Sequence, residues 1–135
     1  MRFFIVLIVA MFLEGCGLVA QKKADELLSR STQADWGVLD SDHEATERAY
    51  ILQTLKDPYS AMFRFSTPTR GVSHSLGEPV LAWYSLVYVN AKNSFGGYVG
   101  ERPYGFAYRC PANGKCQLIN YGIPHYRDFD LQWQR

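Results

Sequence analysis

The sequence predicts a single α+β domain, in which an N-terminal helix packs on a three- to four-stranded antiparallel meander. Three observations support this. The chain of 135 residues is 47% hydrophobic and 20% charged, which is the balance of a folded domain. Of its 20 aromatic residues, 16 lie at or beyond Tyr50, so the core is expected in the second two-thirds of the chain. A segment with helical spacing also precedes several strand-like segments that turn residues separate.

The helix is expected to run from Ser41 to about Lys56. Ser41 followed three residues later by Glu44 has the sequence of a capping box, which satisfies free amides at a helix start. Asp57-Pro58 is expected to end the helix, with Pro58 opening a short second turn. Apolar residues recur at helical spacing and predict the buried stripe: Ala45, Ala49, Leu52 and Leu55, with Ile51 beside them.

Two segments after the helix predict strands. Residues 63–65 are expected to form a short strand. Residues 66–78 are expected to be a loop, because Pro and Gly recur along them. Residues 79–90 carry apolar side chains at both odd and even positions. A strand of that composition is covered on both faces and therefore lies in the centre of its sheet.

The remaining segments extend the meander. In residues 98–110, alternate positions predict one buried face: Tyr104, Phe106, Tyr108 and Cys110. Residues 116–121 are expected to return along this strand. The tail, residues 122–135, is aromatic and is expected to pack back through Phe129 and Trp133.

The N-terminus has the pattern of an export signal. Arg2 precedes eleven unbroken apolar residues, 3–13. This run is shorter than the roughly 20 apolar residues that a transmembrane helix needs, and it suits a signal peptide. Extending it would bury Glu14, at a cost of about 2.5–3.5 kcal/mol. The chain is therefore expected to be exported.

The residues that follow, Leu13-Glu14-Gly15-Cys16, resemble the lipobox of bacterial lipoproteins, although Glu14 stands where that family has a small or uncharged residue. The resemblance implies that Cys16 becomes the first mature residue and carries a lipid. Residues 1–15 would then be the signal peptide, 16–40 a partly helical tether, and 41–135 the domain. Gly17 is not the aspartate that retains lipoproteins in the inner membrane, which implies an outer-membrane anchor facing the periplasm. The alternative is cleavage after Ala20, which releases a soluble protein.

The cysteine count agrees with lipid attachment. The three cysteines are Cys16, Cys110 and Cys116, and lipidation of the first leaves an even pair. Pro111 to Lys115 is typical of a hairpin end with a three-residue loop, closed by a left-handed Gly114. That register places Cys110 opposite Cys116, with α-carbons about 4.5 Å apart, within reach of a disulfide. It also sets Leu118 opposite Tyr108. No histidine lies nearby to complete a zinc site, so no metal is expected.

Residues 56–64 and 89–100 resemble segments found in small uncharacterised bacterial exported proteins and lipoproteins, and the resemblance implies no activity. The second segment contains the contact loop, residues 90–100. Asn90 and Asn93 tolerate turn geometry and cap amides, while adjacent glycines allow a close bend. Lys92, Phe95 and Tyr98 are expected on or beside its tip, where they would contact an envelope protein or glycan. The alternative is that these residues serve only the turn.

Composition limits the function further. A net charge of +1 argues against nucleic acid as a partner. The sequence has no phosphate-binding loop and no zinc spacing, so no cofactor and no enzymatic activity are expected. A hydrolase using His74 or His125 is the minor alternative.

We therefore expect a non-enzymatic lipoprotein that is attached to the membrane through a lipid on Cys16. The rival is a soluble periplasmic or secreted inhibitor-type module, with the disulfide-closed hairpin as a wedge against an envelope hydrolase or a toxin.

Overall fold

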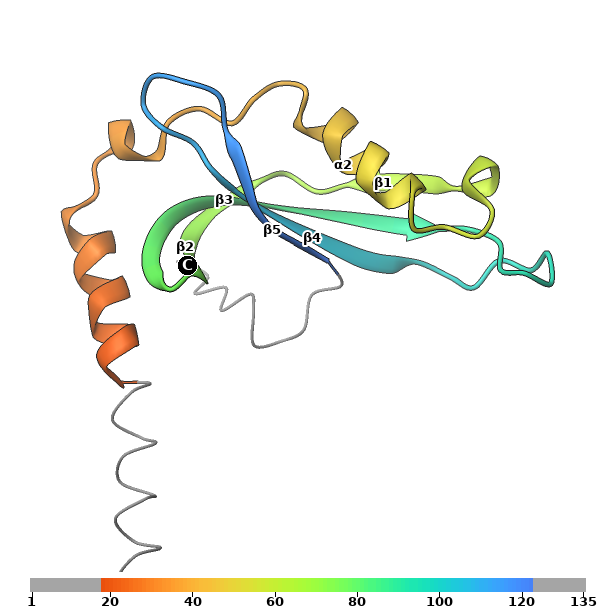
Figure 1. Ribbon diagram of the computed structural model, residues 1–135, viewed down its shortest axis with the longest axis horizontal. Helices are drawn as coiled ribbons and strands as arrows, with labels where there is room; N and C mark the ends of the chain where they lie inside the picture. Colours follow the sequence, from red (N-terminus) through yellow and green to blue (C-terminus); the bar gives the residue numbers. More distant parts are fainter. Residues whose placement is uncertain (1–17, 123–135) are drawn as a thin grey trace, which may run out of the picture.

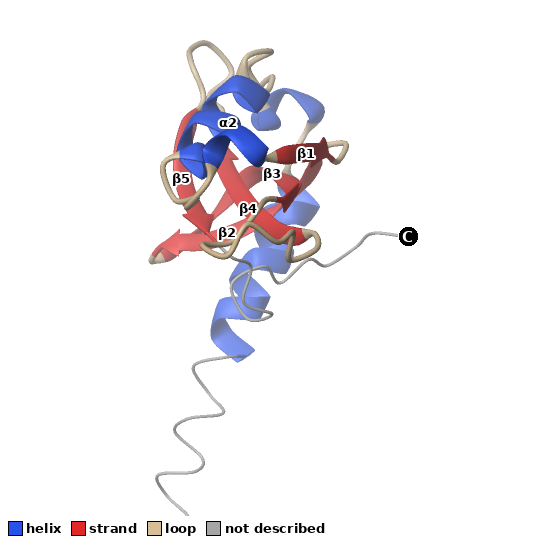
Figure 2. Ribbon diagram, turned by 90° about the vertical axis from the view of Figure 1, so that its right-hand side faces the viewer, coloured by secondary structure: helices blue, strands red, loops and turns tan. Residues whose placement is uncertain are grey.

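The computed structural model describes residues 18–122, except for the side chain of Ser75. Residues 18–30 are helical. The elements that follow are η1 (Gln33–Trp36), α2 (His43–Leu52), η2 (Pro58–Ser60), β1 (Met62–Phe65), β2 (Thr69–Leu76), β3 (Glu78–Asn90), β4 (Arg102–Arg109) and β5 (Gln117–Gly122). Helix α2 lies across one face of the antiparallel sheet (Figures 1 and 2). The prediction of an α+β fold is therefore confirmed. The expected packing of Phe129 and Trp133 lies outside the described residues.

Strand β3 is the centre of the sheet, as its two-sided apolar pattern predicts. β4 pairs along one of its edges, and β5 pairs with the far side of β4. Along its other edge, β1 pairs with residues 87–90 and β2 with residues 78–84. Because β1 and β2 follow one another along the same edge, the five strands make a meander that is four strands wide.

The expectation of a loop over residues 66–78 was wrong, because most of it is strand β2. This segment is polar and does not alternate, so it carries no strand pattern of its own. It becomes a strand because β3 is 13 residues long and β1 covers only its last four. Gly71 also allows a close approach, since a Cβ there would lie 3.0 Å from the ring of Tyr84. Pairing with a long central strand outweighs a weak local preference.

The main core lies between α2 and the sheet. Its buried residues come from α2, from β3 and from β4 with the residue that follows it. They are Ile51, Val87, Val89, Phe106, Tyr108 and Cys110. The predicted inward face of β4 is confirmed, because Phe106, Tyr108 and Cys110 all belong to this core. A smaller cluster on the opposite face of the sheet contains Ala82, Tyr84 and Ala107.

Helix α2 turns a different face to the core from the one that its apolar residues predict. Ala45 and Ala49 are exposed, whereas Glu47 and Ile51 are buried. Ile51 fills the space above Val87 and Phe106 in the core cluster. The helix is short, and its weak apolar pattern does not decide its orientation. The orientation of the helix is decided instead by the large Ile51 side chain, which packs on the sheet. Glu47 lies one helical turn before Ile51 on the same face, so it is buried as well.

The predicted capping box at Ser41 was also wrong. The helix begins at His43 with Asp42 as its N-cap, and no side chain caps it. The preceding turn is held instead by Asp40, whose carbonyl oxygen accepts from the His43 amide at 3.2 Å. The carboxylate of Asp40 accepts from the Cys116 amide at 3.1 Å, which ties this turn to the hairpin and shifts the helix start. The helix also ends at Leu52, four residues before the predicted Lys56.

The predicted disulfide is confirmed: Cys110 and Cys116 are bonded, with α-carbons 4.1 Å apart. Leu118 stands opposite Tyr108, as the hairpin register predicts. Gly114 has a φ of 151°, so it is not in the left-handed helical conformation that was expected. Register is decided by the number of residues in the loop, and this prediction succeeded although the turn geometry differs.

The segment between helix 18–30 and α2 contacts the sheet through tryptophan side chains. The indole N–H of Trp83 donates to the carbonyl oxygen of Trp36 at 3.0 Å. The guanidinium of Arg70 lies 4.6 Å from the ring centroid of Trp83 and 5.7 Å from that of Trp36, close enough for cation–π attraction to both. Helix 18–30 adds an ion pair of 3.0 Å between Lys23 and Glu78 at the turn between β2 and β3.

Candidate functional site

The contact loop has a backbone that is bonded internally. The carboxamide oxygen of Asn93 accepts from the amides of Phe95 and Gly97, at 2.9 and 3.1 Å. The Asn93 amide in turn donates to the Gly97 carbonyl at 2.9 Å. The carboxamide of Asn90 accepts from the Gly100 amide at 3.1 Å. Both asparagines therefore point into the loop and stiffen it, as their preference for turns predicts.

The base of the contact loop rests on η2, a contact that sequence reasoning did not predict. The hydroxyl oxygen of Ser60 accepts from the Lys92 amide at 2.8 Å, and its proton goes to the Asp57 carbonyl at 2.9 Å. Ser60 and Lys92 lie 32 positions apart in the sequence. Only the pairing of β1 with β3 brings them together, so no local pattern signals this contact.

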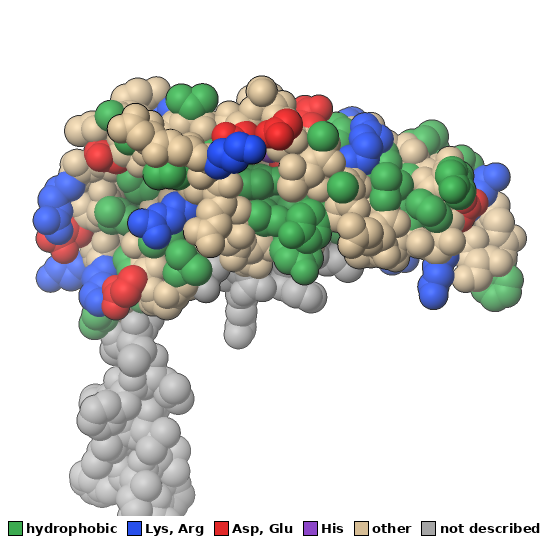
Figure 3. All heavy atoms as spheres, turned by 45° about the horizontal axis from the view of Figure 1, so that its top comes forward, with side chains coloured by type: hydrophobic (Ala, Val, Ile, Leu, Met, Phe, Trp, Pro, Cys, Tyr) green, Lys and Arg blue, Asp and Glu red, His purple; other side chains and the backbone are tan. Residues whose placement is uncertain are grey.

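The tip of the loop presents aromatic side chains to solvent. Phe95 is 96% exposed, and Tyr98 is half exposed with the Lys92 ammonium 5.5 Å from its ring centroid. Tyr59 on η2 is fully exposed at the same end of the molecule and was not among the predicted contact residues (Figure 1). Hydrophobic side chains gather at this end in the space-filling view (Figure 3). Of the predicted residues, Lys92, Phe95 and Tyr98 are therefore available to a partner, whereas Asn90 and Asn93 support them.

Charge is absent from the tip itself. Residues 93–100 contain no acidic or basic side chain. Next to them, Glu101 forms a bidentate pair with Arg64, at 3.1 and 2.6 Å. The Arg64 guanidinium lowers the pKa of Glu101. The same guanidinium lies 4.0 Å from the ring centroid of Tyr88. Residues 93–100 are thus an uncharged aromatic surface, with the Lys92 ammonium beside Tyr98 and with the carboxylate that follows in the sequence, Glu101, already paired.

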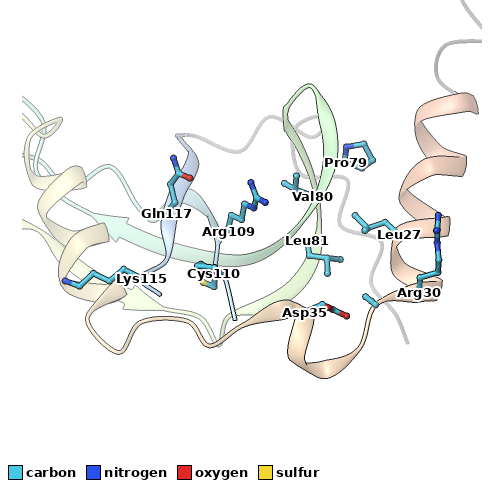
Figure 4. Close-up of a pocket in the computed structure, with 12 residues that line it drawn as sticks. Leu27, Arg30, Asp35, Pro79, Val80, Leu81, Arg109, Cys110, Lys115 and Gln117 are labelled. Carbon is cyan, nitrogen blue, oxygen red and sulfur yellow. The ribbon is translucent and has the colours of Figure 1, made fainter. Parts of the chain in front are cut away.

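A concave region lies at the other end of the sheet, with a volume of about 780 Å³. Leu27 of helix 18–30 and Leu81 of β3 approach one another across it, and Arg109 and Gln117 project from β4 and β5 (Figure 4). Its charged lining residues are Arg30, Asp35, Arg109 and Lys115, and all four are exposed to solvent. This hollow therefore offers a charged rim, without a buried polar group that would orient a ligand.

Beneath α2 lies a buried carboxylate that the sequence did not indicate. Glu47 has no exposed surface, and one of its oxygens accepts from the Ser85 hydroxyl at 3.0 Å. Its other oxygen and the hydroxyl of Tyr108 are both buried, and neither makes a hydrogen bond of favourable geometry among the described residues. Burial raises the pKa of Glu47, and the Ser85 hydroxyl, the nearby His43 and the Tyr108 hydroxyl oppose this only in part. Burial and the charge of Glu47 likewise raise the pKa of Tyr108.

The other residues considered for chemistry are scattered. His43 lies at the start of α2 with its Nδ1 2.8 Å from the Asp40 carbonyl oxygen, and His74 is exposed on β2. His125 and Cys16 lie outside the described residues. Within residues 18–122, no group of three His, Cys, Asp or Glu side chains is placed to hold a metal ion.

Comparison of this chain with known proteins found no similar protein. No protein-family model matches the chain, and neither a curated protein nor a solved structure matches it. Across the described part of the chain, no helix is both long enough and apolar enough to cross a membrane.

Proposed function

We propose that this chain is a non-enzymatic lipoprotein of the bacterial envelope, anchored through Cys16, whose domain binds an envelope protein or glycan with the contact loop. The observation that carries the proposal is Phe95, an aromatic side chain that is 96% exposed on a loop whose amides are bonded internally. A stiff loop loses little conformational entropy on binding, and aromatic side chains supply much of the energy at interfaces.

The position of the contact loop supports the same proposal. The helical residues 18–30 follow Cys16 closely in the sequence and lie at one end of the domain (Figure 1). The contact loop lies at the other end, beyond η2 (Figure 1). A lipid on Cys16 would therefore leave the contact loop and η2, which carry Phe95 and Tyr59, at the end of the domain far from the point of attachment, where a partner reaches them.

The first experiment tests the contact loop. A Lys92→Ala/Phe95→Ala variant and a matched Val38→Ala/Lys115→Ala variant are expressed as the full chain, and partners are cross-linked and recovered from the bacterial envelope. The control also removes one lysine and one exposed apolar side chain, because Val38 is 82% exposed and lies beside the disulfide hairpin. Wild type and control should recover the same partner, and the loop variant should lose it. Equal recovery by all three proteins contradicts the proposed contact surface.

The second experiment tests the anchor. The intact mass of the protein from membranes should correspond to a chain that begins at Cys16 with a diacyl- or triacyl-glyceryl group. A soluble product that begins at Gln21 would contradict the anchor and favour the inhibitor-type module. The two experiments fail independently, because the loop can bind a partner whether or not the chain carries a lipid.

A further inference from the structure

Glu47 is the one charged residue that is fully buried in the described part of the chain. A buried carboxylate normally has a cationic partner, because leaving water is costly for a charge. None of the salt bridges between described residues involves Glu47. The neighbouring Arg48 points elsewhere and lies 4.2 Å from the ring centroid of Phe63. The ionised form of Glu47 is therefore poorly compensated.

The groups that face Glu47 come from three elements. Helix α2 contributes His43 and Glu44, whose charges act on it in opposite directions. Strand β3 contributes the Ser85 hydroxyl, and strand β4 contributes Tyr108. The His43 ring also meets the Tyr108 ring edge to face, with centroids 6.5 Å apart. His43 is half-buried and reaches solvent, so it does not replace a cation inside the core.

Protonation would relieve the cost of burying this charge. One oxygen of Glu47 and the hydroxyl of Tyr108 are buried without a hydrogen bond of favourable geometry among the described residues, although the two groups are close enough for each to shift the pKa of the other. The tyrosine hydroxyl favours the ionised carboxylate, but together with Ser85 and His43 it offsets only part of the effect of burial on the pKa of Glu47. The protonated form removes the uncompensated charge. It also keeps the hydrogen bond from the Ser85 hydroxyl, because the other carboxyl oxygen still accepts it.

We propose that Glu47 is a proton-operated latch, in which the protonated carboxyl docks α2 on the sheet and ionisation of that carboxyl loosens the docking. The latch operates whether or not the chain is anchored or the contact loop binds a partner. Burial sets its direction by raising the pKa of Glu47 above the ordinary value of 4.5. The stability that the latch contributes is then fully present below pH 4.5 and is lost as the pH rises through the folded-state pKa.

The latch also adjoins the contact loop. Residues 53–57 are all that separates α2 from η2, and Ser60 of η2 accepts from the Lys92 amide. Opening of α2 is therefore expected to disturb the base of the loop before it disturbs β4 and β5, which are held by the hairpin disulfide.

The test follows the carboxyl and the helix separately in the full chain. The ¹³C resonance of the Glu47 side-chain carboxyl reports its titration. Hydrogen exchange of α2, corrected for the intrinsic effect of pH, reports its docking. We expect a titration midpoint above 4.5 and a loss of α2 protection as the pH rises through that midpoint. A midpoint at or below 4.5 overturns the proposal, and so does α2 protection that does not change across a raised midpoint.

Two variants sharpen the result. Glu47→Gln has nearly the same shape and is neutral at every pH, so its α2 protection should match wild type at acid pH, exceed it at high pH and lose the dependence on pH. Glu44→Gln removes an exposed carboxylate from the same helix whose charge raises the pKa of Glu47, so it should keep the dependence on pH with a midpoint at somewhat lower pH. If Glu47→Gln keeps the dependence, the latch is not at Glu47.

Discussion

The backbone of Gly37 lies directly against the backbone of Cys110. A Cβ at position 37 would stand 2.6 Å from the Cys110 carbonyl oxygen and 2.7 Å from that of Pro111. Gly37 also has φ 59° and ψ −166°, a conformation that is essentially restricted to glycine. The segment after η1 can therefore close over the disulfide hairpin only if residue 37 has no side chain.

Gly37→Ala is expected to lower the free energy of unfolding by about 3 kcal/mol, the upper end of the cost of a strained backbone, because the steric clash adds to the strain. Chemical denaturation measures the loss. Gly77→Ala is the control, since Gly77 also has a positive φ of 86° but open space around its Cβ position. If the two variants lose the same stability, the contact with Cys110 contributes nothing.

Replacing both Cys110 and Cys116 by serine is expected to lower the free energy of unfolding by about 2 kcal/mol, because the closed loop is short. The hairpin tip should exchange its amides faster than the rest of the sheet. The Cys116 amide, which donates to Asp40 at 3.1 Å, is the most informative probe. Unchanged exchange at Cys116 would mean that Asp40 and Gly37 hold the hairpin without the disulfide.

Asn93→Ala is expected to loosen the contact loop while leaving the domain folded. It removes the acceptor of the Phe95 and Gly97 amides, which solvent can then reach. Amide exchange should rise several-fold within residues 93–98 and remain the same in β3 and β4. Ser94→Ala is the neighbouring control. A loop that stays protected in Asn93→Ala would show that the glycines and the Ser60 contact determine its shape.

Tyr108→Phe is expected to raise the pKa of Glu47 further, because the tyrosine hydroxyl favours the ionised carboxylate. The pH window in which a protonated Glu47 stabilises the fold should therefore extend to higher pH. Thermal unfolding followed across pH gives this window, and Tyr104→Phe, on the same face of β4, is the control. A window that moves to lower pH would contradict the interaction between Tyr108 and Glu47.

Local patterns in the sequence predicted those parts of the fold that depend on neighbouring residues. The alternation of Phe106, Tyr108 and Cys110 predicted the buried face of β4, because strand geometry repeats every two residues. The length of the loop after Cys110 predicted the disulfide partner. In the contact loop, Asn93 signalled the turn because it bonds to amides only two and four positions away.

Tertiary structure decided the rest. The sequence of β2 has no strand pattern, and it pairs only because β3 extends beyond β1. Apolar spacing in α2 indicated the wrong face, because the fit of Ile51 over the sheet decides which side is buried. Glu47 is carried inward by that fit, and the contacts of Ser60 with Lys92 and of Gly37 with Cys110 join residues far apart in the chain. The sequence by itself thus determined four of the five strands (β1, β3, β4 and β5), the disulfide and the internal bonds of the contact loop. Only packing between distant segments placed a carboxylate in the core, because burial depends on what a neighbouring element covers.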